Sequence, residues 1–247
     1  RLQQLEFSCG NYTSGKYFQV DKMLEDQKHR DEIISKIKDY NFKISAISCH
    51  GNPLAPGEYG KQHDSVIRKT IKLASILKLD KVILLSGCAA GPGDINPNWI
   101  VSCWPPERMK ILEWQWNEVL IPYWKDVSTY AEGLGVKLCF ELHGGDMVYN
   151  APTTHRVRDQ VSKNIGANLD PSHVLWMGGD PIQMAKDLDE ALFYVHIKDT
   201  TINHPKAALN TLMETTWFAD VEKRSWNFSS PGHGHDETWW SQFLLAV

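Results

Sequence analysis

Carboxylate, imidazole and amine side chains stand at the ends of four short apolar runs in this sequence. They are His50, Glu141, His143, Asp170, His173, His196, Lys198 and Asp199. A Glu, an Asp and a His from successive runs would form a mixed oxygen and nitrogen site for a divalent cation, with Mn²⁺, Mg²⁺ or Co²⁺ favoured and Zn²⁺ as an alternative. Each residue alone could equally be a polar cap or a satisfied buried group. Four such run ends together predict a shared metal site.

The runs that carry these residues have the length and near-continuous apolarity of strands that are buried on both faces. The predicted strands are residues 2–8, 43–49, 81–86, 137–143, 164–170 and 193–199. Helices are predicted near 26–40, 62–78, 107–133, 155–163 and 180–191, with another from 237. This alternation predicts a parallel sheet with right-handed crossovers. Side chains two apart on a strand share a face, so Glu141 lies with His143 and His196 with Lys198.

The predicted fold is a single α/β domain over residues 1–247, a (β/α)8 TIM barrel with its active site at the carboxyl ends of the strands. Only six strands can be counted, a strand already opens the chain, and the chain stops within a predicted helix. We therefore expect a first βα unit and a last strand to be missing from these residues. A doubly wound open sheet is the alternative, but no GxGxxG follows any predicted strand.

The composition excludes several classes of function. A net charge of -4 argues against general binding to nucleic acid or to anionic membranes, because both need a surplus of Lys and Arg. No apolar run approaches the ~20 residues that cross a bilayer. The five cysteines are odd in number and form no CxxC pair, which predicts reduced thiols and a cytoplasmic location.

Three weaker features are open to two interpretations each. The loop 88–106 is long for this architecture, which is typical of a lid or a functional loop, and the faces of its Trp99 and Trp104 could cover a sugar ring. His235 belongs to the Gly-rich segment PGHGHD, whose His and Asp either contact a metal or substrate or serve as turn and cap residues. His173, three residues after Asp170, either contacts a substrate oxygen or orients Asp170.

Five segments of the chain resemble the xylose isomerase-like TIM barrel family. They are CHGNPL (49–54), FELHGG (140–145), NLDPSH (168–173), VHIKDT (195–200) and PGHGHDETWW (231–240). The resemblance covers nearly the whole chain and is strongest to the sugar phosphate isomerase/epimerase branch, which is related to ketose 3-epimerases, inosose dehydratases and endonuclease IV. These segments are specific for the superfamily and say little about the substrate.

The resemblance implies a divalent metal, most often Mn²⁺, held by Glu141, Asp170 and His196, with His173 touching the substrate. The family's fourth ligand, a Glu on the eighth strand, has no counterpart among these residues. An Arg that ketose 3-epimerases place soon after the seventh-strand His is also absent, and Thr200 and its neighbours stand there instead. That departure weakens a direct transfer of ketose 3-epimerase specificity.

The leading hypothesis is a metal-dependent sugar isomerase or epimerase, in which Glu141 transfers a proton next to a chelated carbonyl through an enediolate. The residues assigned to substrate binding are His50, His143, His173, Lys198, Trp104 and His235. A lyase on 3-keto glycosides or inososes is the alternative, and a non-catalytic sugar- or metal-binding subunit is a more remote one. A DNA repair nuclease is disfavoured because it needs a basic track for phosphates. We expect a small sugar or keto-sugar as substrate and a homo-oligomer, with a hetero-complex as an alternative.

Overall fold

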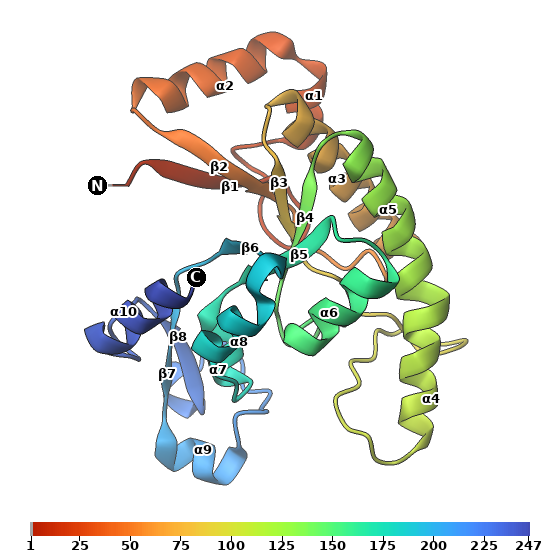
Figure 1. Cartoon of the computed structure of the whole chain (residues 1–247), viewed down its shortest axis with the longest axis vertical. Helices are drawn as coiled ribbons and strands as arrows, with labels where there is room; N and C mark the ends of the chain where they lie inside the picture. Colours follow the sequence, from red (N-terminus) through yellow and green to blue (C-terminus); the bar gives the residue numbers. More distant parts are fainter. Residues whose placement is uncertain (1) are drawn as a thin grey trace.

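Six parallel strands form one curved sheet in which each strand lies beside its neighbours in the sequence (Figure 1). The structure is a computed structural model and describes residues 2–247. The strands are β1 (Gln4–Ser8), β2 (Lys43–Ser48), β3 (Lys81–Leu84), β4 (Lys137–Glu141), β5 (Ile165–Leu169) and β6 (Leu192–Val195). A doubly wound sheet reverses its strand order at a switch point. The unbroken order β1 to β6 therefore excludes that alternative.

The sheet curls until its two edges meet through side chains. His196, just after β6, lies 2.9 Å from Glu6 on β1, measured from Nε2 to Oε2. Two residues earlier on β6, the hydroxyl of Tyr194 lies 2.7 Å from the hydroxyl of Ser45 on β2. Within residues 2–247 no backbone ladder joins β6 to β1. The six strands thus form part of a (β/α)8 barrel, as the sequence predicts.

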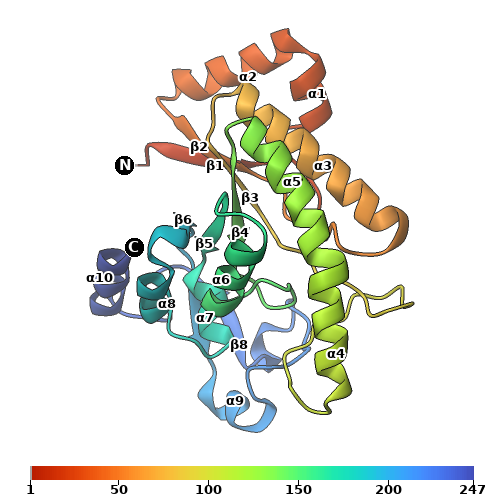
Figure 2. The same cartoon turned by 45° about the vertical axis from the view of Figure 1, so that its right-hand side comes forward.

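Helices flank the strands (Figures 1 and 2). They are α1 (Val20–Glu25), α2 (Gln27–Asp39), α3 (Gly57–Ile76), α4 (Glu107–Trp114), α5 (Ile121–Gly133), α6 (Ala151–Gln160), α7 (Pro171–Trp176), α8 (Pro181–Leu188), α9 (His204–Asn210) and α10 (Glu237–Ala246), with short 3-10 turns at Asp189–Ala191 and Val221–Lys223. Of these helices, α3, α5, α6 and α8 pack against the six-stranded sheet. The predicted helix 107–133 is continuous but contains a π-helical turn at Gln115–Leu120. This π-helical turn lies just before Pro122, whose backbone has no N–H to donate to a regular helical hydrogen bond.

The main hydrophobic core lies between the sheet and these helices. Outward-facing Val82 and Leu138 pack there with Ile71 of α3 and Trp124 of α5, all fully buried. The removal of such side chains from water contributes most of the free energy that holds the layers together. A smaller cluster of Ala46, Ile83 and Cys139 fills the inner face of the sheet. The inner side of the sheet is therefore filled by apolar side chains along the strands and becomes polar at the carboxyl ends of the strands.

The chain forms a second sheet that the sequence does not predict. β7 (Asp199–Ile202) pairs antiparallel with β8 (Trp226–Ser229), and α9 lies in the connection between them. The predicted strand 193–199 is consequently split: it leaves the barrel sheet after Val195 and enters the small sheet at Asp199. The backbone N–H of His196 still donates to the carbonyl of Leu169 on β5 at 3.0 Å. Beyond that bond the chain leaves the barrel sheet, and the side chains of His196 and Lys198 reach the ends of β4 and β5.

Two features bear on the chain's surroundings. None of the helices that the structure describes is both long and apolar enough to cross a membrane. All five cysteines are free thiols, and four of them are buried.

Candidate active site

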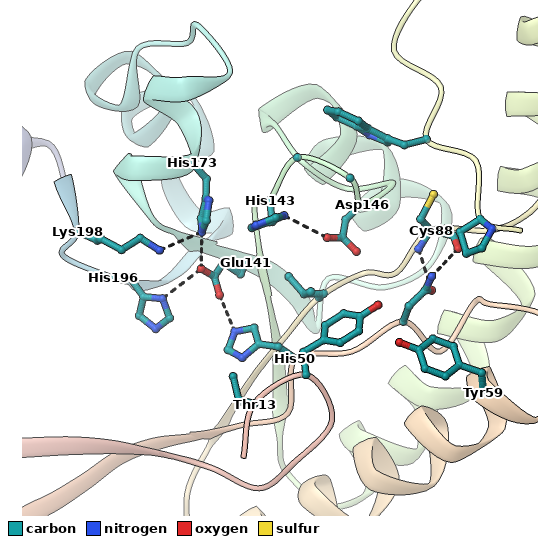
Figure 3. Close-up of a pocket in the computed structure, with 17 residues that line it drawn as sticks. Thr13, His50, Tyr59, Cys88, Glu141, His143, Asp146, His173, His196 and Lys198 are labelled. Carbon is teal, nitrogen blue, oxygen red and sulfur yellow. Dashed lines mark hydrogen bonds and ion pairs between the residues drawn. The ribbon is translucent and has the colours of Figure 1, made fainter. Parts of the chain in front are cut away.

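The carboxylate of Glu141 lies at the centre of a group of imidazoles at the end of β4 (Figure 3). Its residue is 6% exposed. One oxygen, Oε1, lies 3.1 Å from Nε2 of His173 and 3.6 Å from Nδ1 of His196. The other oxygen, Oε2, lies 2.5 Å from Nε2 of His50. The three histidines follow β5, β6 and β2, so the carboxyl ends of three strands converge on the carboxylate that ends β4.

These contacts decide the charge of the group. Burial raises the pKa of Glu141, but hydrogen bonds from His173, His196 and His50 outweigh it and hold the pKa well below its ordinary value. Burial lowers the pKa of His196, but Glu141 and Glu6 together raise it to about 10. At neutral pH the Glu141 carboxylate is ionised, which is the form that a base or a metal ligand requires.

Asp170 adds a second carboxylate directly after β5. Its Oδ1 accepts a hydrogen bond from the backbone N–H of Ser172 at 2.9 Å and so caps helix α7. Its Oδ2 lies 2.8 Å from Nζ of Lys198 and 3.5 Å from Nε2 of His173. The Lys198 ammonium also lies 4.2 Å from the ring centre of Phe228 on β8. One oxygen of Asp170 therefore stabilises the fold, and the other points into the site.

The donor set fits a divalent cation. Glu141, Asp170 and His173 each offer one ligand atom within 4.8 Å of the other two. Two carboxylate oxygens with one imidazole suit Mn²⁺, Mg²⁺ or Co²⁺, with Zn²⁺ also accommodated. Asp170 already accepts from a cationic group, Lys198. The close set contains His173, whereas His196 reaches Glu141 from another direction, so the assignment of His196 as the nitrogen ligand stays a prediction.

A cavity of about 780 Å³ opens beside this group. Asp146 lies on its wall. Burial raises the pKa of Asp146 to about 8, since the added effect of the Glu141 charge and the opposing hydrogen bond from the Gly87 backbone are both smaller. Burial and the neighbouring His173 lower the pKa of His143 to about 4. Both shifts favour the uncharged side chains near neutral pH, and Nδ1 of His143 lies 3.7 Å from Oδ2 of Asp146. Neutral donors and acceptors of this kind suit the hydroxyl groups of a sugar.

Three aromatic side chains also line the cavity. Tyr12, Tyr59 and Trp99 line it, from the ends of β1, α3 and the loop after β3. The loop that carries Trp99 is anchored, because the buried amide of Gln115 donates to the carbonyls of Ala89 and Asn98 at 2.7 and 2.9 Å. The cavity wall thus combines polar groups at the strand ends with aromatic rings.

The structure brings most of the predicted residues together. Four of the six predicted substrate contacts line the cavity, and they are His50, His143, His173 and Lys198. Trp104 is 74% exposed and lies outside the cavity lining, where its loop neighbour Trp99 takes the wall position. His235 also lies outside the lining, since its Nδ1 bonds to the buried carboxylate of Asp199 at 2.7 Å.

The second interpretation of PGHGHD, as turn and cap residues, agrees with these contacts. Asp236 caps α10 by accepting from the N–H of Trp239 at 2.9 Å. The Asp199 carboxylate accepts from the backbone N–H groups of Gly232, Gly234 and His235. This loop is therefore wrapped around one buried carboxylate.

The sequence does not predict several residues of the site, and three of them contact the predicted histidines or line the cavity beside them. Glu6 contacts His196 from the far edge of the sheet, Asp146 lies on the cavity wall, and Phe228 packs edge-on against His173 with ring centres 5.2 Å apart. A carboxylate between the apolar residues Leu5 and Phe7 was an available signal for Glu6. Nothing in the sequence near Phe228 points to a site 55 residues upstream.

The fold and the site define a class of protein. The chain belongs to the xylose isomerase-like TIM barrel family, whose model matches residues 12–247. It is 41% identical over 250 residues to the uncharacterized protein YfiH of Bacillus subtilis (strain 168), a match that spans 100% of this chain and 80% of YfiH.

Solved structures show the same fold at low identity. A D-tagatose 3-epimerase-like protein superposes with a TM-score of 0.62 at 16% identity, over 100% of this chain and 77% of that one. The IolI protein, solved with a bound zinc atom, superposes with a TM-score of 0.61 at 18% identity, over 99% of this chain and 74% of that one.

Proposed function

We propose that this chain is a divalent-metal-dependent sugar isomerase or epimerase, which moves a proton next to the carbonyl of a keto-sugar. The observation that carries the proposal is the buried, ionised carboxylate of Glu141, with three imidazoles around it and Asp170 beside it. The likeness in fold to a D-tagatose 3-epimerase-like protein and to a zinc-bearing protein supports it.

The chain's own side chains have distinct tasks in this proposal. Glu141 and Asp170, with His196 or His173, would hold the cation, which supplies Lewis acidity to the substrate carbonyl when bound. Glu141 accepts the proton from the adjacent carbon, and the C–H electron pair moves toward the carbonyl, whose oxygen gains negative charge. Lys198 stabilises that charge as a cationic donor, since its Nζ lies 3.3 Å from Nε2 of His173 at the same end of the cavity.

The fate of the proton decides the product. Returned to the neighbouring carbon, while the hydroxyl proton passes to the former carbonyl oxygen, it converts a ketose and an aldose into each other. Returned to the same carbon from the opposite face, it gives an epimer and needs a second proton carrier. In heavy water, isomerisation places deuterium on the neighbouring carbon of the product, and epimerisation places it on the carbon that lost its proton. Uptake of deuterium from solvent therefore tests the first step of both reactions.

The proposal is tested by metal content and by turnover together. We expect about one Mn, Co, Mg or Zn ion per chain in the purified protein, and its loss when Asp170→Asn and His196→Ala are combined. With that metal present, a panel of ketoses should show interconversion with epimers or aldoses by NMR. Equal metal content in the wild type and the double variant, or no metal after incubation with Mn²⁺, would contradict the site.

A lyase is the second candidate, and the aromatic side chains of the cavity favour it. An oxyanion formed next to a 3-keto group lets a substituent on the β carbon leave with its electron pair. The wall of Tyr12, Tyr59 and Trp99 would suit a planar leaving group joined to the sugar. Release of a phenol from a 3-keto glycoside, with no turnover of simple ketoses, would replace the isomerase assignment by this one.

The surroundings of the enzyme belong to the same proposal. The substrate is a small sugar or keto-sugar, and the free cysteines support a reducing, cytoplasmic setting. A homo-oligomer, with a hetero-complex as the alternative, stays a prediction that light scattering of the purified protein would test. Turnover by the chain alone would set aside the remote alternative, a non-catalytic binding subunit.

A further inference from the structure

Glu6 makes an unusual contact for a residue of the first strand. β1 and β6 are the two edges of the sheet, yet Oε2 of Glu6 lies 2.9 Å from Nε2 of His196, which follows β6. Both side chains are mostly buried, with 20% and 25% of their surfaces exposed. Glu6 is not part of the close set of metal-binding atoms, so its role has to be sought in what it does to His196.

The chemistry of a ligating histidine gives that role. A histidine that binds a cation through one ring nitrogen is neutral and carries its single hydrogen on the other nitrogen. An ionised carboxylate can only accept, so Glu6 requires the hydrogen of His196 to be on Nε2. The lone pair is then on Nδ1, which is the nitrogen that faces Oε1 of Glu141 at 3.6 Å.

We propose that Glu6 is a positioning residue that fixes the ring orientation and tautomer of His196, so that Nδ1 is presented to a cation beside Glu141. This inference rests on the metal site of the proposed function. A carboxylate behind a ligating histidine also makes the imidazole a better donor, and loss of such a partner typically lowers metal affinity about 10- to 100-fold.

The surroundings hold both partners in place. Neighbouring side chains on a strand point to opposite faces, and Phe7 packs on the helix side against Phe18 with ring centres 4.5 Å apart. Glu6 therefore points to the inner side, and its backbone is paired with Ala46 of β2. On the other side of the ring, the side-chain amide nitrogen of Asn168 lies 3.1 Å from Nδ1 and gives the ring a second contact that fixes its orientation.

Metal affinity of the intact chain tests the inference without relying on activity. The variants are Glu6→Ala, which removes the acceptor, and Glu6→Gln, which keeps an acceptor oxygen but loses the charge. Glu25→Gln, an exposed carboxylate on α1, is the matched control. We expect Zn²⁺ and Mn²⁺ to bind Glu6→Ala about 10- to 100-fold more weakly than wild type, with Glu6→Gln between them and the control unchanged.

Nitrogen-15 NMR of the zinc-loaded protein adds a readout that general destabilisation would not move. In the wild type, Nδ1 of His196 should show the shift of a metal-bound nitrogen, and Nε2 should carry the hydrogen. If both Glu6 variants bound metal with wild-type affinity, or if zinc were bound to Nε2, this inference would be overturned and the proposed function would stand. Absence of metal binding in the wild type would overturn the proposed function together with it.

Discussion

Replacing Asp170 with Asn separates the structural role of this side chain from its chemical one. Asn keeps an oxygen that can accept from the N–H of Ser172, now 2.9 Å from Oδ1, so the cap of α7 survives. It loses the charge that faces Nζ of Lys198 at 2.8 Å. Because the Lys198 side chain is 36% exposed, water replaces most of that interaction, and the loss is about 1 kcal/mol or less.

Replacing the same residue with Ala removes the cap as well. An N-cap contributes about 1 kcal/mol, so Asp170→Ala should lower the free energy of unfolding by about 2 kcal/mol in metal-free buffer. Asp170→Asn should lower it by about 1 kcal/mol or less. Both variants lose a carboxylate that the proposed cation needs. Their metal affinity should fall more than the 10- to 100-fold expected for a residue that only supports a ligand.

Urea unfolding with a chelator present measures the first quantity, and competition with a chromophoric chelator measures the second. Asp180→Asn is the matched control, since Asp180 caps α8 in the same Asp-Pro arrangement but lies away from the site. It should leave metal binding unchanged. The reasoning would be refuted if Asp170→Asn bound metal like wild type, or if it lost as much stability as Asp170→Ala.

Three further predictions concern the walls and loops of the site. Asn52→Ala should lower the free energy of unfolding, measured in urea, by about 2–4 kcal/mol. The buried N–H and C=O of Cys88 are each bonded to Asn52 at 2.9 Å and would lose their partners. A loss below about 1 kcal/mol would contradict this prediction. Burial raises the pKa of Asp199, but hydrogen bonds from His235 and its loop lower it overall, so its stabilising contribution is present above about pH 4 and is lost as pH falls through the lowered folded pKa. Acid titration of stability should accordingly be shallower in Asp199→Asn, and identical curves would count against it. Trp99→Ala should raise KM about two- to tenfold for glycosides with an aromatic group and less for simple ketoses, as steady-state kinetics on both would show.

The sequence predicts the barrel strands and the residues at their carboxyl ends because both signals are local. Strands covered on both faces are nearly continuous in apolar residues, and β2, β4 and β5 begin and end within two residues of their predicted bounds. The end of α5 is equally local, since Gly135 adopts a φ of +71° that favours glycine. Residues such as Glu141 and Asp170 follow directly from those strand ends.

The missing parts depend on contacts between distant residues. Glu6 reaches His196 only because the sheet curls through six strands, and no local pattern encodes that curvature. The pairing of β7 with β8 joins segments more than 20 residues apart, so Phe228 enters the site from a region where the sequence predicts no strand. The raised pKa of Asp146 likewise comes from burial, which exists only in the fold.

Solvent exchange catalysed by Glu141 tests the central claim most directly. Keto-sugars would be incubated in deuterium oxide with the metal-loaded wild type, with Glu141→Gln, and with Glu58→Gln as an exposed control on α3. We predict deuterium at the carbon next to the carbonyl with the wild type and the control, and loss of exchange in Glu141→Gln with its unfolding midpoint retained. Near-normal exchange in Glu141→Gln would contradict the account.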